Sequence, residues 1–180
     1  AYDWGKVERI SPEAPVPIIS LTKRENRLGG AANVALNIQA LGATPVLCSV
    51  IGEDLDGDDL LSLMEKLKMP ADGIVRSSAR VTTTKRRMLA GYQHLLRIDN
   101  ETDKTLTEDE TKKLLEKIKS LVNEVDVVIF EDYDKGVISE EIISATVKMC
   151  REKGIPVTVD PKKRNFLSYK GVSLFKPNLK

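Results

Sequence analysis

The sequence predicts an α/β domain in which helices cover a parallel sheet and a smaller β-sheet stands beside it. From Val46 onward, strand-like apolar runs alternate with amphipathic helical runs, and this alternation is typical of a parallel sheet flanked by helices. Some helical runs carry clear start signals, and two β-like segments interrupt the alternation. These observations define the fold class, and each element follows from its own residues.

The strand-like runs are short, apolar and followed by polar residues. In chain order they are PVLCSVIG (45–52), EVDVVIFED (124–132), IPVTVD (155–160) and VSLFKP (172–177). Apolar runs of this length, rich in Val and Ile, are typical of buried strands in a parallel sheet. The carboxyl ends of these strands should therefore meet at one edge, where ligands bind in open α/β sheets.

The helical runs carry their own boundaries. GDDLLSLMEKLK (57–68) is amphipathic, and Thr107 with Glu110 forms a capping box ahead of a second helix. SEEIISATVKMCREKG (139–154) begins with a Ser cap, has acids in its first turn and ends at Gly154. We expect helices in all three places.

Two segments, about 7–21 and 81–99, break the alternation and predict the separate small sheet. The first contains RISPEAPVPIISL, and the second has two β-like arms around Ala90-Gly91. The proline-rich part suits only an edge strand, while its apolar neighbours need a partner. Pairing with a second subunit is plausible, and a monomer that folds this segment on itself is the alternative.

The composition limits the possible partners and setting. Lys and Arg total 28 against 27 Asp and Glu, which gives no reason to expect nucleic acid or an anionic membrane. Cys48 and Cys150 are isolated, so a disulfide framework or zinc site has little support, and a cytoplasmic setting is expected. Neither a spanning segment nor a leader is apparent. The start without Met and the end at Lys180 suggest a piece of a longer protein.

The stretch RLGGAANVALNIQALG, Arg27 to Gly42, places two glycines before a helical run. A P-loop is excluded because no Gly-Lys-Ser/Thr follows, and the GxGxxG fingerprint fails because Gly29 and Gly30 are adjacent. What remains is a close backbone approach to a ligand, with the amide of Asn33 as donor and acceptor, which suits a sugar hydroxyl. The alternative is that the glycines only turn the chain.

These residues resemble the N-terminal signature of the ribokinase-like (PfkB) sugar kinases. The match comprises GGAANVA (29–35), Gly42, and Gly52 after a further strand. Within that family the chain is similar to heptose 7-phosphate kinases, and the similar segments are RISPEAPVP (9–17), Thr84-Lys85 with Arg87, LRID (96–99), Asp132-Tyr133 with Lys135-Gly136, DPK (160–162) and PNL (177–179).

The resemblance implies a fold, a substrate and cofactors. Residues 1–180 would form part of a ribokinase-like domain, with the segments 7–21 and 81–99 as a β-lid through which a homodimer forms. The substrate would be a sugar phosphate and the cofactors ATP and Mg²⁺. Gly29, Gly30 and Asn33 would bind the sugar, whereas Lys176 and Asn178 would lie near the nucleotide.

The domain would be truncated at both ends: a sugar-contacting Asp is expected before Ala1 and the catalytic Asp beyond Lys180. The piece alone would then be inactive.

The remaining candidates are charged residues whose roles stay open. Lys85 and Arg87 share one face of a predicted strand, so with Arg97 they could bind the sugar's phosphate. A charged, solvated strand edge is the alternative. Glu131 and Lys135 follow a strand and are expected to bind substrate, unless they are helix-capping and surface charges. No catalytic or metal-binding residue is assigned within the chain.

The aromatic residues and the single histidine carry less information. His94 lacks the context of a nucleophile triad and is expected to lie on the surface or lid. Trp4 and the scattered tyrosines predict no stacking platform. Besides the heptose phosphate kinase, a PfkB kinase for another sugar or nucleoside, or a non-catalytic sugar-phosphate binding module, remains possible at this point.

Overall fold

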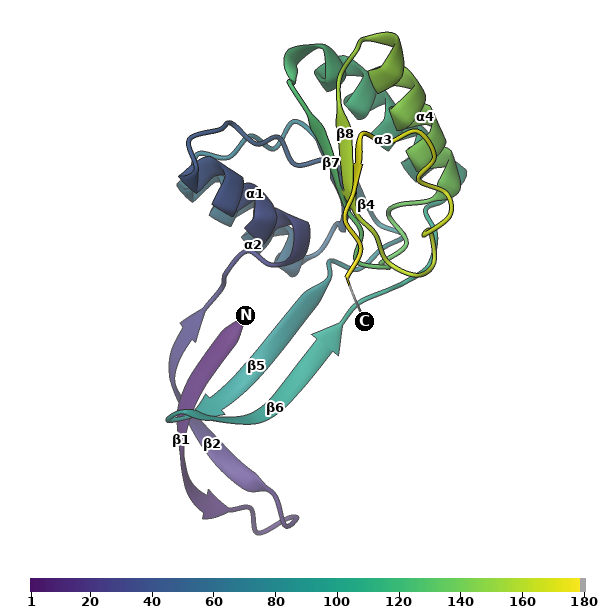
Figure 1. Cartoon of the computed structure of the whole chain (residues 1–180). Coiled ribbons are helices and arrows are strands. Elements are labelled where there is room, and N and C mark those ends of the chain that lie inside the picture. Colours follow the sequence, from purple (N-terminus) through teal and green to yellow (C-terminus); the bar gives the residue numbers. More distant parts are fainter. Residues whose placement is uncertain (179–180) are drawn as a thin grey trace.

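The computed structural model of the chain describes residues 1–178, so Leu179 of the PNL segment lies outside the described residues. The body has two short parallel sheets. One pairs β3 (Ser49–Gly52) with β4 (Ile74–Ser77), and the other has the order β7 (Val128–Glu131), β8 (Val157–Asp160), β9 (Leu174–Phe175). Figure 1 shows helices packed around these strands.

The helices are α1 (Gly30–Ala40), α2 (Leu55–Lys66), α3 (Glu108–Leu121) and α4 (Glu140–Glu152), and a 3₁₀ turn (Val122–Glu124) follows α3. The capping box of Thr107 and Glu110 and the Ser139 cap are both present, as predicted. Helix α2 begins two residues before the predicted 57, because the Asp54 side chain accepts a hydrogen bond from the backbone N of Gly57.

The hydrophobic core lies in two clusters. The larger one joins α3 and α4 to β7 and β8, with Leu114, Ile143 and Val157 at most 2% exposed. The smaller one joins α1 and α2 to β3 and β4 around Met64, which is fully buried. Strand β4 was not predicted, because its apolar part is only Ile74 and Val75. The alternation of strands and helices is confirmed in the rest of the body.

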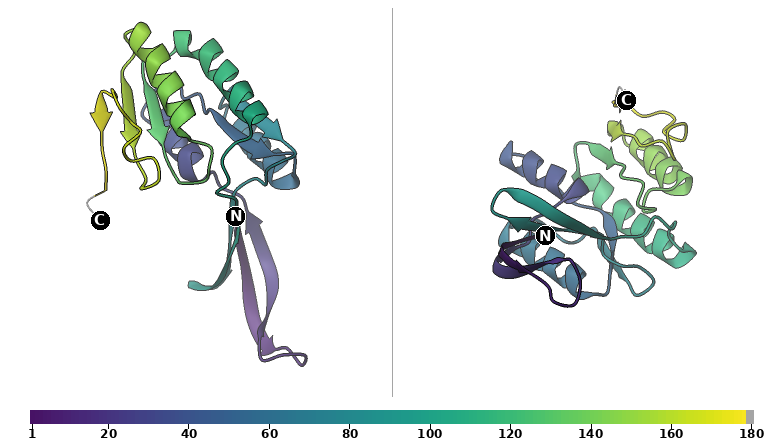
Figure 2. Two further views of the ribbon diagram at one scale, coloured as in Figure 1. Left: turned by 90° about the vertical axis from the view of Figure 1, so that its right-hand side faces the viewer. Right: turned by 90° about the horizontal axis from the view of Figure 1, so that it is seen from below.

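The four remaining strands form a sheet of their own with the order β2-β1-β5-β6. They are β1 (Tyr2–Ile10), β2 (Pro17–Glu25), β5 (Thr84–Ala90) and β6 (Gln93–Asn100). Figures 1 and 2 show this sheet, which we call the lid, extending away from the body. The first pair is longer than the expected segment 7–21, because β1 begins at Tyr2 and pairs in parallel with β5.

The base of the lid is anchored by α2. The carboxylate of Asp54 accepts from the backbone N of Thr82 at 2.8 Å, and Asp56 accepts from the Thr84 hydroxyl at 3.1 Å. Asp3 of β1 is 1% exposed and pairs with Arg24 at 2.9 Å. The base is therefore held by buried or partly buried polar contacts, which fix how the lid leaves the body.

Candidate functional site

The carboxyl ends of β7 and β8 place two acids next to each other. Glu131 and Asp160 are directly paired in the parallel register. Burial and the nearby Asp160 raise the pKa of Glu131, while Lys176 and Lys162 oppose that rise. Asp160 has a buried Oδ1 with no hydrogen-bond partner among the described residues. This edge thus offers carboxylate oxygens and lysines to a ligand, as the strand ends predicted.

The loop after β7 is shaped by a buried carboxylate. Asp132 is 3% exposed and accepts hydrogen bonds from the Tyr169 hydroxyl at 2.7 Å, Asn165 Nδ2 at 3.2 Å and the backbone N of Asp134 at 2.9 Å. Because an unpaired buried charge is costly, these donors fix the loop. Asp132 therefore has a structural role that sequence reasoning did not separate from its neighbours.

The two glycines form the start of α1. Gly29 is the N-cap residue and makes no side-chain cap hydrogen bond, and Gly30 has φ +52°. A Cβ on Gly30 would lie 3.8 Å from the Tyr133 ring, so the glycine brings α1 close to the loop after β7. The first-turn amides of a helix bind hydroxyl or anionic groups well when no side chain caps them. Asn33 is exposed one turn into the helix.

The predicted cations of the lid are brought together, but they are paired with acids. Lys85 Nζ donates to Asp99 at 3.0 Å and to Glu101 at 2.9 Å, and Arg97 pairs with Asp99 at 2.9 Å. Glu101 also accepts from Lys135 Nζ at 2.7 Å. These contacts raise the pKa of Lys85 and lower that of Glu101. Glu101, which sequence reasoning missed, therefore joins the lid to the loop after β7.

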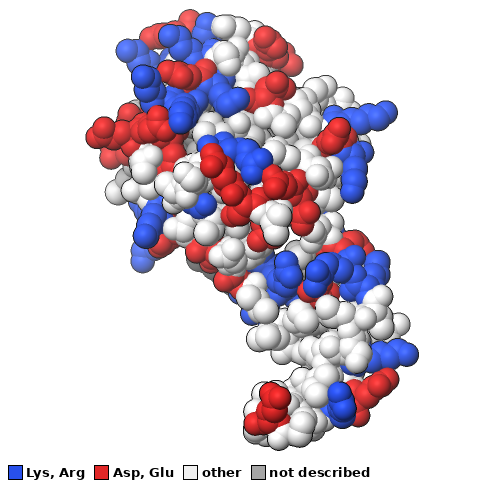
Figure 3. Space-filling model, turned by 180° about the vertical axis from the view of Figure 1, so that it is seen from behind, with Lys and Arg blue, Asp and Glu red and all other residues white. Residues whose placement is uncertain are grey.

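The strand register places Lys85 and Arg87 on the same face of the lid. Lys85 lies opposite Asp99 and Arg87 lies opposite Arg97 in the antiparallel β5–β6 pair, and directly opposite residues point to the same face. Arg87 donates to the backbone O of Lys85 at 3.3 Å, and its Cζ lies 5.2 Å from the centre of the Tyr2 ring. In Figure 3, Lys and Arg gather over the base of the lid, while both signs intermix over the body.

Two aromatic side chains of β1 form a stacked pair. The rings of Tyr2 and Trp4 stack with centroids 5.6 Å apart and planes at 19°. Arg27 lies over both rings, with Cζ 4.9 Å from the centre of Tyr2 and 6.0 Å from that of Trp4. The alternation of aromatic residues in β1 was visible in the sequence, but Arg27 reaches these rings only because β2 pairs beside β1.

The two residues assigned to the nucleotide lie at the last strand. Lys176 is exposed, and its backbone N donates to the Val159 carbonyl at 3.0 Å, which extends the pairing of β9 with β8. Asn178 is exposed and is the last described residue. Both follow the carboxyl end of β9, and Lys176 is near enough to Glu131 to oppose the rise of its pKa. Neither residue makes a side-chain hydrogen bond among the described residues.

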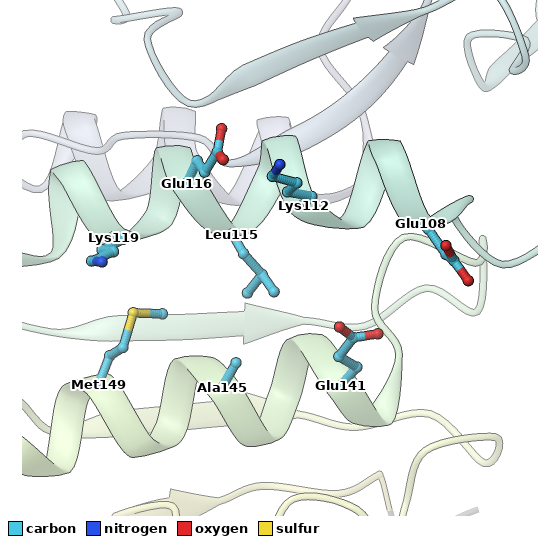
Figure 4. Close-up of a pocket in the computed structure, with 8 residues that line it drawn as sticks. All are labelled: Glu108, Lys112, Leu115, Glu116, Lys119, Glu141, Ala145 and Met149. Carbon is cyan, nitrogen blue, oxygen red and sulfur yellow. The ribbon is translucent and has the colours of Figure 1, made fainter.

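A groove between α3 and α4 lies elsewhere on the surface. Its lining comprises Glu108, Lys112, Leu115, Glu116, Lys119, Glu141, Ala145 and Met149, whose side chains Figure 4 shows on the facing sides of the two helices. None of the predicted site residues lines it. Within residues 1–178, no helix is long and apolar enough to cross a membrane, and no group of three acidic, Cys or His residues could hold a metal ion.

The architecture is that of a ribokinase-like α/β kinase domain. The pfkB family carbohydrate kinase model matches residues 3–180, and the chain belongs to this family. Solved structures agree in fold: ribokinase of Arabidopsis thaliana complexed with ribose and ATP (TM-score 0.62, 16% identity) and phosphofructokinase-2 of Escherichia coli in its tetrameric inhibited form (TM-score 0.59, 18% identity). Each alignment covers 98% of this chain, and 56% and 57% of those chains, respectively.

Similar sequences include proteins called bifunctional protein HldE. The chain is 40% identical to that of Wolinella succinogenes over 179 residues and 41% identical to that of Pelobacter propionicus over 177 residues. These alignments cover 99% and 98% of this chain, but the chain spans only 38% and 36% of those proteins. The similarity to heptose 7-phosphate kinases within the family is thereby confirmed.

Proposed function

We propose that the full-length protein phosphorylates D-glycero-D-manno-heptose 7-phosphate with ATP to give the 1,7-bisphosphate, a precursor step for ADP-heptose and the lipopolysaccharide core. The identity of about two residues in five with the HldE proteins supports this choice of substrate. The cytoplasm, which supplies ATP, is the compartment we propose. Family membership alone supports only phosphoryl transfer to a carbohydrate.

The cations between the lid and the body are the observation that supports a phosphorylated acceptor. Lys85 from β5 and Lys135 from the loop after β7 bind the same carboxylate, that of Glu101. Two lysines that bind one carboxylate can bind a phosphate in the same way, because both anions accept charge-assisted hydrogen bonds. We assign Arg87 and Arg97 to the same role, since both lie on this face of the lid.

The sugar itself would lie on the start of α1. The uncapped amides after Gly29 can donate to sugar hydroxyls, and Asn33 can donate and accept. Glu131, at the end of β7, would accept a hydrogen bond from a hydroxyl on the side of the sugar that faces away from α1. The acceptor would then lie between the glycines and the lid, with its phosphate toward Lys85 and Arg87.

The nucleotide would bind along the carboxyl edge of β8 and β9. Lys176 and Asn178 lie there, and a lysine stabilises the charge of a transferring phosphoryl group. Magnesium, when bound with ATP, neutralises phosphate charge. Asp160, with its unpartnered buried Oδ1, fits it chemically, since carboxylate oxygens are its preferred protein ligands. Transfer would follow an in-line path to the anomeric hydroxyl.

A homodimer through the lid is also part of the proposal. The lid exposes large apolar side chains, among them Ile10 (61%), Val16 (51%) and Leu96 (56%). A second lid would bury them, which is favourable at about 25 cal/mol per Å² of apolar surface. Sedimentation of the full-length protein, wild type and Leu96→Asp, tests this proposal: a monomer in both cases would contradict it.

The substrate is tested with a panel of acceptors. The full-length protein is assayed with ATP and Mg²⁺ against heptose 7-phosphate, fructose 6-phosphate, ribose and adenosine. We expect the highest kcat/KM with heptose 7-phosphate. A clear preference for another sugar or for a nucleoside would contradict the proposal and leave a PfkB kinase of different specificity.

A further inference from the structure

We propose that Arg27, which lies between β2 of the lid and α1, is a further phosphate-binding residue and that the Tyr2 ring positions it. This inference rests on the proposed function, because it names how the phosphorylated end of the acceptor is recognised. The aromatic face, as we call it, comprises Tyr2 and Trp4 of β1 with Arg27 and Arg87 beside them. Neither Arg27 nor Tyr2 belongs to the residues assigned above to the substrate.

The strand register places this face on the same side of the lid as the predicted phosphate cations. Tyr2 pairs with Arg87 across the parallel β1–β5 ladder, and Arg87 pairs with Arg97 across β5–β6. Directly paired residues share a face of the sheet. Tyr2, Arg87 and Arg97 therefore point to one side, and the adjacent paired residue Asp3 is buried on the other.

The same side of the lid faces the parts of the body that we assign to the substrate, namely the start of α1 and the loop after β7. Lys85 lies on it and is joined through Glu101 to Lys135, which follows Tyr133 in the loop beside Gly30. On the opposite face, Arg86 lies within 4.0 Å of Asp56 in α2. The two faces thus have different neighbours, and the aromatic face is the one turned toward the start of α1.

The position of Arg27 in the chain ties it to the glycines. It lies two residues before Gly29, and two residues span at most about 7 Å. Its side chain is 55% exposed and is free to meet a ligand. A sugar bound at Gly29 would therefore have its substituents within reach of this guanidinium.

The contacts of Arg27 orient its donors. Its Nε is paired with the carboxylate of Glu25, and its Cζ lies 4.9 Å from the centre of the Tyr2 ring. Arg27 and Lys23 together lower the pKa of Glu25 to about 2, so this partner stays charged at neutral pH. Within residues 1–178 no protein hydrogen bond occupies the terminal nitrogens of Arg27. An arginine held by Nε and by stacking presents these nitrogens as a fork, the geometry that binds phosphate in bidentate fashion.

The test compares acceptors with and without phosphate in the full-length protein. We expect Arg27→Gln to raise the KM for heptose 7-phosphate at least about tenfold, the effect of losing a hydrogen bond from a charged donor. The KM for ATP and the KM for unphosphorylated heptose should each change less than about twofold. Arg27→Lys should fall in between, because a lysine keeps the charge but loses the fork.

The positioning role of Tyr2 has its own variants. Tyr2→Phe keeps the ring and should leave the KM for heptose 7-phosphate unchanged, whereas Tyr2→Leu should raise it several-fold. The control is Lys6→Gln, an exposed cation two residues beyond Trp4 on the same strand, which should change none of these values. Equal effects on both acceptors would indicate that Arg27 and Tyr2 only support the lid, and would overturn the inference.

The two proposals fail in different ways. If heptose 7-phosphate is the preferred acceptor and Arg27→Gln leaves its KM unchanged, the inference is wrong while the proposed function stands. If another phosphorylated sugar is preferred and its KM depends on Arg27, the inference stands and the heptose assignment is wrong. A preference for an unphosphorylated acceptor contradicts both.

Discussion

Replacing Tyr169 with Phe should measure how strongly the buried carboxylate of Asp132 depends on its donors. The Tyr169 hydroxyl donates to Asp132 Oδ2 at 2.7 Å, and both residues are buried. Burial and the charge of Asp132 raise the pKa of Tyr169, so the hydroxyl stays a donor across the pH range of the assay. The substitution removes this donor and leaves the aromatic ring in place.

The magnitude follows from the contacts that remain. The ring of residue 169 would still pack against Phe130 and Phe175, whose centroids lie 5.6 and 6.5 Å away, so the loss of packing is small. Asp132 would keep its hydrogen bonds from Asn165 and from the backbone of Asp134. One hydrogen bond to a charged group contributes about 1.5–3 kcal/mol. We expect a loss of about 2 kcal/mol in the free energy of unfolding.

Urea unfolding of the full-length protein, followed by circular dichroism, gives this value. Hydrogen exchange adds a local measurement, because the amides of the loop after β7 should exchange faster in the variant. The matched control is Tyr92→Phe, which removes the same hydroxyl from a fully exposed side chain and should cost less than about 0.5 kcal/mol. If Tyr169→Phe costs no more than this control, the buried network does not stabilise the loop and our reasoning is refuted.

Three further predictions concern single residues. Gly30→Ala should cost about 1–2 kcal/mol in the free energy of unfolding, because φ is +52° there. Gly29→Ala should cost less, because φ is −134° with open space around it and only the weaker preference of the N-cap for glycine is lost. Equal costs in urea unfolding would contradict this. Glu131 has a raised pKa, so its ionisation weakens the fold as pH rises through the folded value. Glu131→Gln should therefore be more stable than wild type at about pH 8, with the gain vanishing below about pH 4, and a gain that persists in acid would argue against burial as its cause. Burial raises the pKa of Cys48 to about 11, so its alkylation by iodoacetamide at neutral pH should be much slower than that of a free thiol, as mass spectrometry of the labelled peptide would report.

Local signals in the sequence were sufficient to predict most helices and strands of the body. The capping box at Thr107 and the Ser139 cap lie within one turn of the helices that they begin, so they could be read without knowing the fold. The glycine pair was likewise recognisable, because its positive φ at Gly30 needs a residue without a side chain. The strand ends at Glu131 and Asp160 were also predicted, because in each case a short apolar run is followed directly by polar residues.

The sequence by itself thus determined the fold class, the helix boundaries within about a turn and the family signature, since each depends on residues close together in the chain. Only the tertiary structure decided which charges and rings meet. Glu101 binds Lys85, 16 positions before it, and Lys135, 34 positions after it. Arg27 reaches Tyr2 only through the pairing of β1 with β2. Strand register brings such residues together, and register depends on which strands become neighbours, a choice made by the burial of the whole sheet.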